Sequence, residues 1–415
     1  MQVDRHASSL VAEALADTPI VVVQGARQVG KSTLASELLA SRGLGLLTLD
    51  DSVQRAAAAA DPDGFVDRVE SCVGIDEVQL EPGLVRAVKA SVDRDRAPGR
   101  FLLTGSADLL RVAGVQESLA GRAETIELEV FSQGEIAGIR ESFVDRAFAG
   151  ETIAAPMQRL SRNDYLERIV LGGYPEVIAR PSARRRRQWF GNYVERIVRR
   201  DIPDIVELRR DDVLNRLLRL FAARGVAELN VAQIGSELGV PATTLPRYVD
   251  SLRIVYLISE LPAWSRNLGT RVVRRPKYSV SDTGLAASLI NVDAQAMSVG
   301  SRGSDAAGGL VEAFVIAELR RSIAWSETRP VMHYFRDRGG REIDIILEAP
   351  DGRVVAIEVK ASTSVSNGDF RHLRWLADTI GGDFVAGLVL NTGHVTERFG
   401  DRLAVAPISS LWSET

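Results

Sequence analysis

The chain has 415 residues, of which 51 are Lys or Arg and 55 are Asp or Glu, so its formal net charge at pH 7 is −4. This balance excludes a generally polycationic protein, although it permits a local basic surface on a mildly acidic body. Apolar residues make up 45% of the chain and charged residues 26%, which is typical of folded proteins and excludes a largely disordered chain. The length predicts roughly two to four domains.

The single cysteine, Cys72, excludes a disulfide within the chain and argues against a cysteine-built metal site. The first 20 residues contain four charged side chains, at Asp4, Arg5, Glu13 and Asp17, which argues against a secretory signal. No stretch approaches about 18 apolar residues free of charge, so we expect no transmembrane helix and no membrane partner. These features predict a cytoplasmic protein.

The first 150 residues alternate short apolar runs with helical patterns. The runs are rich in branched side chains, which is typical of buried parallel strands, and they lie at residues 20–23, 46–49, 73–75, 101–103 and 126–130. Helical spacing appears at residues 32–39 and again at residues 83–92. This alternation predicts an α/β fold with a doubly wound parallel sheet in a first domain, residues 1–150.

A glycine-rich loop joins the first predicted strand to the first predicted helix. Its sequence, Gly25-Ala26-Arg27-Gln28-Val29-Gly30-Lys31-Ser32, matches G-x-x-x-x-G-K-[ST] in full. In this motif, backbone N–H groups and the positive end of the helix hold phosphate oxygens. We expect Lys31 to reach the β- and γ-phosphates of ATP and Ser32 to bind Mg²⁺. The predicted site for ATP comprises Gly25, Ala26, Arg27, Gln28, Val29, Gly30, Lys31, Ser32 and Thr33.

Polar residues end the later strands of the same predicted sheet. We expect Asp76 to hold the Mg²⁺ shell and Glu77 to activate a water for attack on the γ-phosphate, whereas solvated acids at a strand end are the alternative. Thr104 either senses the γ-phosphate or positions the water, or it only forms a turn. Arg122 either acts on a γ-phosphate as an arginine finger or forms a surface ion pair.

Several motifs spread over nearly the whole chain resemble prokaryotic AAA-type ATPases that carry a C-terminal domain of unknown function. They are the phosphate loop, Ile75-Asp76-Glu77-Val78-Gln79, Leu103-Thr104-Gly105-Ser106, Leu119-Ala120-Gly121-Arg122, Gly172-Gly173-Tyr174-Pro175-Glu176, Arg200-Asp201-Ile202, Glu312-Ala313-Phe314 and Ile357-Glu358-Val359-Lys360. The resemblance implies an AAA-like phosphate-loop core, a winged-helix module and a C-terminal α/β fold similar to restriction endonucleases. Ser32 stands where many members have Thr, and either hydroxyl can bind Mg²⁺.

Two parts are predicted in the middle of the chain. Residues 151–227 have helical patterns without a convincing strand, so we expect a helical lid. The lid includes a basic segment at residues 184–200, which either adds to a nucleic-acid surface or is a solvated helix. Residues 228–297 are the winged-helix candidate. Their pattern predicts a helix, a tight turn and a second helix, followed by two short strands around a polar loop at residues 255–280.

The winged-helix candidate carries the residues that predict nucleic-acid binding. Its second helix is expected to present Thr243, Thr244, Arg247 and Tyr248 outward. The loop between its strands is the most basic nonhelical stretch of the chain, with Arg266, Arg271, Arg274, Arg275 and Lys277. Such side chains contact phosphates and base edges, so they predict a DNA-binding surface. The alternative is that the module packs against another protein or against the ATPase core.

The last predicted domain, residues 298–415, begins with a Gly- and Ser-rich linker at residues 298–309. Asp344 and Glu358 lie on two predicted strands joined by a tight turn, and antiparallel pairing brings them to within about one residue of being opposite. Lys360 shares a strand face with Glu358. A divalent metal would explain why so much charge lies in a mostly apolar sheet.

This pattern resembles the Asp…Glu-x-Lys signature of restriction-endonuclease-like nucleases, in which carboxylates bind Mg²⁺ and the lysine helps to stabilise or generate the attacking hydroxide. The resemblance implies that Asp344 and Glu358 are metal ligands with Lys360 nearby. Glu312, on the preceding predicted helix, matches the helix acid of that fold. The alternative is a structural ion pair on a fold without nuclease activity.

Two functions therefore remain open from the sequence. In the first, the protein is an Mg²⁺-dependent ATPase that acts on DNA, with or without nuclease activity in its C-terminal domain. In the second, it is a nucleotide-driven switch whose C-terminal half binds a protein partner. A homo-oligomer is compatible with both.

Overall fold

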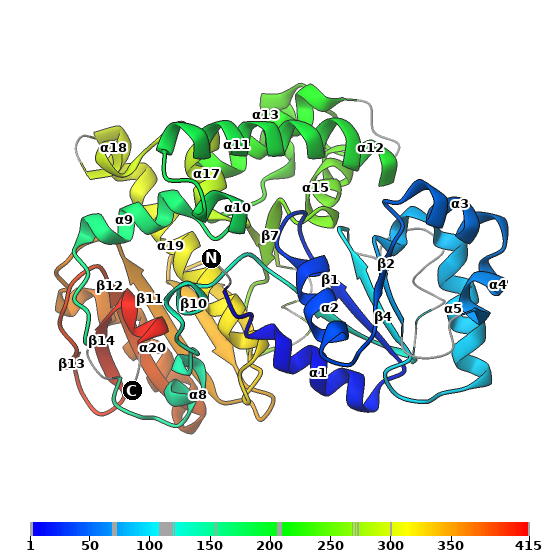
Figure 1. Cartoon of the computed structure of the whole chain (residues 1–415). Coiled ribbons are helices and arrows are strands. Elements are labelled where there is room, and N and C mark those ends of the chain that lie inside the picture. The colour runs from blue at the N-terminus through cyan, green and yellow to red at the C-terminus, as the bar shows by residue number, and fades with distance from the viewer. Residues whose placement is uncertain are drawn as a thin grey trace.

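The computed structural model describes residues 3–68, 73–107, 119, 121–153, 156–205, 210–267, 269, 271, 274–298 and 301–413. Figure 1 shows an N-terminal α/β core in blue and cyan beside a C-terminal α/β domain in orange and red, with green helices lying across the top. Among the described residues, no helix is long and apolar enough to cross a membrane.

The N-terminal core is a five-stranded parallel sheet in the order β2-β3-β4-β1-β5. Its strands are β1 (Ile20–Gln24), β2 (Leu46–Thr48), β3 (Val73–Asp76), β4 (Phe101–Gly105) and β5 (Ala123–Glu127). Helices α1 (Ala7–Asp17) and α2 (Lys31–Ala40) pack with Val21 and Val23 of β1. Ile20 and Val22 instead pack with the cluster formed by α3 (Ser52–Ala60), α4 (Pro62–Asp67) and α5 (Pro82–Arg94). The doubly wound parallel sheet predicted from the sequence is confirmed.

The last core strand begins earlier than predicted, at Ala123 rather than at residue 126. Leu128 lies beyond the strand and its N–H donates to the Gln24 carbonyl oxygen at 2.7 Å. The chain then leaves the sheet through α7 (Gln133–Ala137) and α8 (Phe143–Phe148). In the segment at residues 126–130, Ile126, Leu128 and Val130 are buried, whereas Glu127 is exposed, and only its first two residues belong to the strand.

A helical layer follows in the order predicted for a lid. Its elements are α9 (Arg162–Leu171), α10 (Pro175–Ile178), α11 (Ala183–Arg196), the π-helix η3 (Ile197–Asp201), α12 (Ile202–Ile205) and α13 (Asp211–Arg224). Figure 1 shows α11 running along the top of the molecule from above α9 toward the core. A single π-helical turn inside a helix is often found at functional sites.

The middle module contains α14 (Val231–Leu238) and α15 (Leu245–Ile254), followed by α17 (Thr283–Leu289) and α18 (Ala294–Ser298). Its antiparallel sheet has the order β6-β8-β7, with β6 (Ala227–Glu228), β7 (Ile258–Leu261) and β8 (Lys277–Val280). The two helices around a turn and the two strands around a polar loop therefore occur as predicted.

The C-terminal domain pairs a long helix with a six-stranded mixed sheet in the order β13-β14-β12-β11-β10-β9. Its elements are α19 (Ser301–Ala324), β9 (Val331–Arg336), β10 (Glu342–Glu348), β11 (Val354–Lys360), α20 (Arg371–Ile380), β12 (Phe384–Asn391), β13 (Glu397–Arg398) and β14 (Leu403–Pro407). Strands β9, β10 and β11 are antiparallel, whereas β11, β12 and β14 are parallel. The chain ends in a 3₁₀-helix, Ile408–Trp412, that is buried.

The predicted linker at residues 298–309 is wrong, because most of it is the first part of α19. Ala307 and Leu310 are buried in the main core cluster. Gly309 packs closely against Gly225, because a Cβ on Gly225 would lie 2.8 Å from the Cα of Gly309, whereas a Cβ on Gly308 would meet nothing within 4 Å. The Gly-rich composition therefore reflects a helix that touches neighbouring backbone, which composition alone does not distinguish from a flexible segment.

Candidate active site

The loop between β1 and α2 has the backbone geometry of a phosphate-binding loop. Gly25 has φ 153°, and a Cβ at this position would lie 2.1 Å from the carbonyl oxygen of Leu128. Gly30 has φ 99° and caps the start of α2. Glycine at both positions avoids these steric conflicts and lets the loop curl around the N-terminus of α2.

Lys31 points back into this loop and is buried. Its Nζ donates to the carbonyl oxygens of Gly25, at 3.0 Å, and Ala26, at 2.8 Å. Burial lowers the pKa of Lys31 to about 8, against the opposing effect of the Glu77 and Asp76 carboxylates. The loop's own carbonyl groups thus hold the ammonium group where phosphate oxygens would compete for it.

Asp76 is the point where the predicted site residues meet. Ser32 Oγ donates to Asp76 Oδ1 at 2.7 Å, and Thr104 Oγ1 donates to the same oxygen. Thr48 Oγ1 donates to Asp76 Oδ2 at 3.3 Å. Because β2, β3 and β4 are adjacent and parallel, their carboxyl ends deliver these side chains to one edge of the sheet. The hydroxyl and carboxylate oxygens are of the type that Mg²⁺ prefers.

Glu77 sits at the turn after β3 in the left-handed region, with φ 56°. Its backbone N–H donates to Thr104 Oγ1 at 3.3 Å. The side-chain amide of Gln79 donates to Glu77 Oε2 and also to Ser106 Oγ, the latter at 3.0 Å. Sequence reasoning did not assign Gln79 a role, although the i, i+2 spacing in Glu77-Val78-Gln79 was visible. The unusual backbone angle and the amide together fix where the Glu77 carboxylate lies.

A cavity of about 540 Å³ opens between the phosphate loop and the helical lid. It is lined by Arg27, Gln28, Gly30, Lys31, Ser32, Thr33, Asp50, Glu77, Pro175, Glu176, Trp189, Asn192, Tyr193, Arg196 and Ile197. The sequence analysis did not assign these lid side chains to the site, because no local motif shows which residues of the lid face the phosphate loop. Trp189 and Tyr193 are stacked, with ring centroids 4.9 Å apart and planes 11° apart.

An ion pair ties the phosphate loop to the lid. Arg27 Nε lies 2.5 Å from Asp201 Oδ2 on the π-helix η3, and the Asp201 side chain is buried. Tyr193 OH donates to the carbonyl oxygen of Arg27 at 3.3 Å, and Tyr174 OH donates to Tyr193 OH at 2.9 Å. The Gly-Gly-Tyr-Pro and Arg-Asp-Ile motifs noted in the sequence therefore both reach the loop.

Arg122 is not brought to the loop. It precedes β5, whose first residue Ala123 pairs with Ile20, the first residue of β1. The phosphate loop follows the opposite end of β1. Arg122 instead forms a bidentate ion pair with Asp93, at 2.6 and 3.1 Å. The arginine-finger interpretation is therefore wrong within one chain, and the surface ion pair that was the alternative is present.

The predicted DNA-binding loop is largely occupied by the C-terminal domain. Arg271 forms a bidentate ion pair with Glu348, and Arg274 Nη1 donates to the carbonyl oxygen of Arg336 at 2.6 Å. Arg266 lies 3.4 Å from Asp383. The backbone takes part as well. The Trp264 N–H donates to the Tyr334 carbonyl oxygen at 2.6 Å, and the Tyr334 N–H donates to the Pro262 carbonyl oxygen at 3.0 Å. The partners lie more than 60 residues further along the chain, so local sequence does not reveal them.

The other predicted nucleic-acid residues have mixed environments. Arg247 and Arg275 are exposed and Thr244 is half-buried at the N-cap of α15. Tyr248, expected to point outward, is buried. Helix α15 begins at Leu245 rather than at residue 242. Tyr248 lies three residues after Leu245 and four before Leu252, so helical spacing places it on the same buried face as these two leucines.

The predicted carboxylate pair of the C-terminal domain is formed. The register pairs Ile345 with Ile357, which places Asp344 opposite Glu358, and the Val359 N–H donates to Asp344 Oδ2 at 2.8 Å. Lys360 Nζ lies 3.3 Å from Glu358 Oε2 and 3.8 Å from Asp369. Burial, with a contribution from the neighbouring carboxylates, raises the pKa of both Asp344 and Glu358.

A lysine from the middle module enters this cluster, which the sequence did not predict. Lys277 is buried, and its Nζ lies 2.7 Å from Glu342 Oε1 and 3.4 Å from Glu312 Oε1. These carboxylates and Asp344 raise the pKa of Lys277 despite its burial. In the part of the chain that the structure describes, no group of three or more His, Cys, Asp or Glu side chains is arranged to hold a metal ion. Lys277 therefore contacts both Glu312 and Glu342, and Arg336 Nε lies 3.9 Å from Glu342 Oε2 as well.

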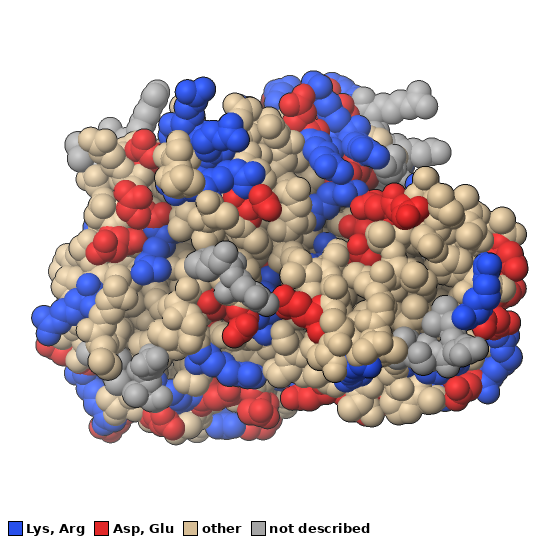
Figure 2. Space-filling view, in the orientation of Figure 1, with Lys and Arg blue, Asp and Glu red and all other residues tan. Residues whose placement is uncertain are grey.

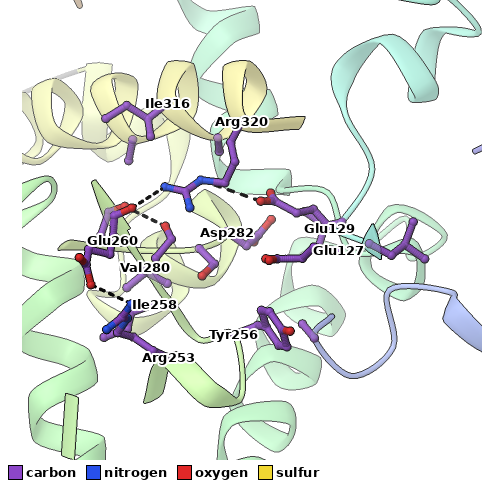
Figure 3. A pocket seen from close by; sticks show the side chains of 18 of the residues that line it. Glu127, Glu129, Arg253, Tyr256, Ile258, Glu260, Val280, Asp282, Ile316 and Arg320 are labelled. Atoms are coloured by element: carbon purple, nitrogen blue, oxygen red, sulfur yellow. Dashed lines mark hydrogen bonds and ion pairs between the residues drawn. The ribbon is translucent and has the colours of Figure 1, made fainter. Parts of the chain in front are cut away.

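A second cavity, of about 350 Å³, lies where core, middle module and α19 meet (Figure 3). Arg320 extends from α19 between two partners, donating to the Glu260 carbonyl oxygen at 3.0 Å and lying 3.9 Å from Glu129. Arg253 lies 2.8 Å from the Glu260 carboxylate. Ala26 of the phosphate loop forms part of the wall. The wall of this cavity therefore combines the phosphate loop with residues of the middle module and of α19.

Comparisons with known families divide the chain into three regions. An AAA domain matches residues 17–137, a domain of unknown function, DUF8612, matches residues 162–296, and another, DUF4143, matches residues 307–411. Uncharacterised proteins of Mycobacterium tuberculosis and Mycobacterium bovis are each 27% identical over 363 residues, which cover 87% of this chain and 75% of the relative.

Among solved structures, the Walker-type ATPase PABY2304 of Pyrococcus abyssi is 17% identical, with a TM-score of 0.41, and the match covers 69% of this chain and 96% of that one. AMPPCP-bound DnaA from Aquifex aeolicus is 15% identical, with a TM-score of 0.30, over 61% of this chain and 89% of that one. The RuvB Holliday junction branch migration motor of Thermotoga maritima is 19% identical, with a TM-score of 0.28, over 63% and 90%.

Proposed function

The chain joins an AAA domain to a C-terminal DUF4143 domain, and we propose that it binds ATP with Mg²⁺ and hydrolyses the γ-phosphate. The observation that carries this proposal is the convergence of Ser32 and Thr104 on the Asp76 carboxylate beside Lys31. A parallel sheet that only ended in solvated acids would not need two hydroxyl groups and a buried ammonium group at that edge.

Each side chain has a defined part in the proposed reaction. Lys31 and the loop N–H groups hold the β- and γ-phosphates, and Ser32 and Asp76 hold the Mg²⁺ shell. Mg²⁺, when bound there, would neutralise charge on the phosphate oxygens. Glu77 takes a proton from the attacking water as the water oxygen bonds to the γ-phosphorus and the bond to the bridging β–γ oxygen breaks. Thr104, which touches both Asp76 and Glu77, positions them relative to each other.

The lid supplies a wall for the nucleoside. Trp189 is half-buried at the cavity and presents a flat ring backed by Tyr193. An aromatic face of this kind stacks on a purine, and base–aromatic stacking is worth about 1–3 kcal/mol. Asn192, on the same helix, offers an amide that can donate and accept hydrogen bonds.

The test compares ATP binding and hydrolysis by the wild type and Lys31→Ala, with Arg55→Ala as a control at an exposed arginine of the core. Lys31→Ala is expected to lose nucleotide binding or hydrolysis, whereas Arg55→Ala keeps both. Unchanged affinity and turnover in Lys31→Ala would contradict the proposal.

A second candidate is a nucleotide-driven switch whose C-terminal half binds a protein partner. The Arg27–Asp201 ion pair favours it, because a phosphate that attracts Arg27 would compete with Asp201 and loosen the lid. Very slow turnover with tight ATP binding would support the switch, and fast multiple turnover without any partner would contradict it.

A nuclease function for Asp344, Glu358 and Lys360 has less support than the ATPase. Lys277 already contacts Glu312 and Glu342, so that cluster is compensated from within the chain. If the domain nevertheless cleaves DNA with Mg²⁺, Lys360→Ala is expected to abolish cleavage and leave ATP hydrolysis intact.

A further inference from the structure

Arg271 and Arg274 of the basic loop are held by the C-terminal domain, and a second strongly basic segment lies in the helical lid. Residues 184–200 contain seven Arg and one Glu, a net charge of +6, in a chain whose total is −4. This segment forms α11 and η3. Figure 2 shows Lys and Arg side chains gathered in the upper part of the molecule, over α11 and α13.

The arginines of α11 and η3 face solvent because the opposite face of the helix is buried. Phe190, Tyr193 and Val194 pack into the core cluster. The exposed arginines, which we name the arginine ridge, are Arg184, Arg185, Arg187, Arg196, Arg199 and Arg200. The positions exposed between them carry polar, acidic or no side chains, at Gln188, Gly191, Asn192 and Glu195.

Little of this charge is neutralised within the chain. Arg199 pairs with Glu195 at 2.8 Å and Arg187 lies 4.0 Å from Asp293. Within the described residues, Arg184, Arg185 and Arg200 have no acidic partner within ion-pair distance. The ridge thus contrasts with Arg271 and Arg274, which are held by the C-terminal domain.

We propose that the arginine ridge binds the phosphodiester backbone of a nucleic acid. From Arg184 to Arg200 the helix rises by roughly 24 Å, at 1.5 Å per residue. One strand of a duplex presents a phosphate about every 3.4 Å of axis, so the ridge faces roughly seven phosphates. The basic residues are all arginine, whose planar fork binds phosphate oxygens in pairs.

Other anionic partners fit the ridge less well. Protein interfaces need an apolar or aromatic centre, and the exposed positions between the arginines provide none. Membrane-surface helices need an exposed apolar face, whereas the apolar face of α11 is buried. A polyanion whose affinity comes from its phosphates requires neither.

The ridge also adjoins the proposed ATP site, although its nucleic-acid affinity does not depend on ATP hydrolysis. Arg196 and Asn192 line the nucleotide cavity, and Asp201 at the end of η3 pairs with Arg27 of the loop. Movement of the lid on ATP binding would therefore shift the ridge. The test uses no nucleotide, so its result is independent of the proposed ATPase.

The experiment measures anisotropy of a fluorescein-labelled DNA duplex of about 20 base pairs with the full-length protein, in about 50 mM salt. The wild type is compared with Arg184→Glu/Arg185→Glu, which lies outside the nucleotide cavity. Arg55→Glu/Arg338→Glu, at two exposed arginines away from the ridge, is the matched control for total charge. Single-stranded DNA and RNA probes of the same length distinguish which nucleic acid is preferred.

The ridge variant is expected to bind at least roughly tenfold more weakly than the wild type, while the control stays within about twofold. The slope of log affinity against log salt should fall in magnitude by about 2, one unit per lost phosphate contact. No binding by the wild type to any of the probes, or equal loss in the control, would overturn the proposal. So would equally effective competition by polyglutamate of the same charge. If the double variant does not fold, Arg184→Gln/Arg185→Gln is used with the same expected slope change.

Discussion

The Lys31 ammonium group illustrates how one side chain's environment sets its chemistry. It is almost fully buried, its Nζ donates hydrogen bonds to two loop carbonyl oxygens, and burial lowers its pKa to about 8. A lysine with its ordinary pKa near 10.4 would remain charged throughout the physiological range. Lys31 instead loses its proton in mildly alkaline solution.

This shift predicts a pH dependence of ATP affinity. Because the free protein holds Lys31 neutral above its pKa of about 8, binding near pH 9 must first recover the proton. The apparent affinity is expected to be about tenfold weaker near pH 9 than near pH 7. Titration calorimetry of the wild type and Lys31→Met checks this, since the variant should be weak and independent of pH. An affinity of the wild type that does not fall with pH would contradict the assignment.

Gln79 gives a second prediction at this scale. Its amide holds the Glu77 carboxylate and reaches Ser106, so it acts through Glu77 rather than on a phosphate. Gln79→Ala is expected to lower kcat by roughly tenfold with little change in KM. Gln79→Asn serves as the conservative comparison and should recover part of the rate only if its shorter amide still reaches Glu77. A change confined to KM would show that Gln79 contributes to binding instead.

At the scale of elements, the lid connects to the loop through η3. Arg27 and Asp201 come from segments 174 residues apart, yet their side chains are close to each other and mostly shielded from solvent. The π-turn brings Asp201 inward while Arg199 and Arg200 remain outside. The same short segment therefore supplies both an internal contact and part of an exposed basic surface.

We expect loss of the Arg27–Asp201 ion pair to lower the free energy of unfolding. Asp201→Asn is expected to destabilise the protein by about 2 kcal/mol, less than for a fully buried pair because Arg27 is partly exposed. Urea unfolding of Asp201→Asn, Arg27→Gln and the double variant forms a double-mutant cycle. If the two decreases in unfolding free energy simply add in the double variant, the two residues are not coupled and the lid is held by other contacts.

Only part of the candidate site could be predicted from the sequence. The phosphate loop, Asp76 and Thr104 were found because their roles depend on local motif and on the carboxyl ends of parallel strands. Trp189 and Gln79 were missed, since their roles depend on what a lid or a turn faces in three dimensions. The glycines at residues 298–309 predicted a linker, because a flexible linker and a helix that closely approaches another backbone segment can have the same composition.

At the scale of the whole molecule, ion pairs connect the middle module to the C-terminal domain. These ion pairs are Arg271 with Glu348, Arg266 with Asp383, and Lys277 with Glu312 and Glu342. The sequence showed the basic residues as one cluster but not that acidic partners more than 30 residues away would contact them. Much of the loop predicted to bind DNA therefore forms an interface inside the chain, although Arg247 and Arg275 are exposed.

Lys277→Met tests this junction. Its removal leaves Glu312, Glu342 and Asp344 without the ammonium group, so stability at pH 7 should fall by about 3 kcal/mol. The pKa values of Glu312 and Asp344 are already raised, so these groups accept protons as the pH falls and the loss should be smaller near pH 5. Urea unfolding at both pH values measures this, with Arg275→Met as an exposed control. Equal losses at the two pH values would argue against carboxylate repulsion as the cause.

The central claim is ATP hydrolysis with Glu77 as the base, and one measurement tests it most directly. The purified wild type and Glu77→Gln are compared for ATP binding and for phosphate release in a single turnover with Mg²⁺. We expect both to bind ATP with similar affinity, and only the wild type to release phosphate, because glutamine cannot take the proton of the attacking water. Phosphate release by Glu77→Gln at the wild-type rate would contradict this assignment, and no ATP binding by the wild type would contradict the account as a whole.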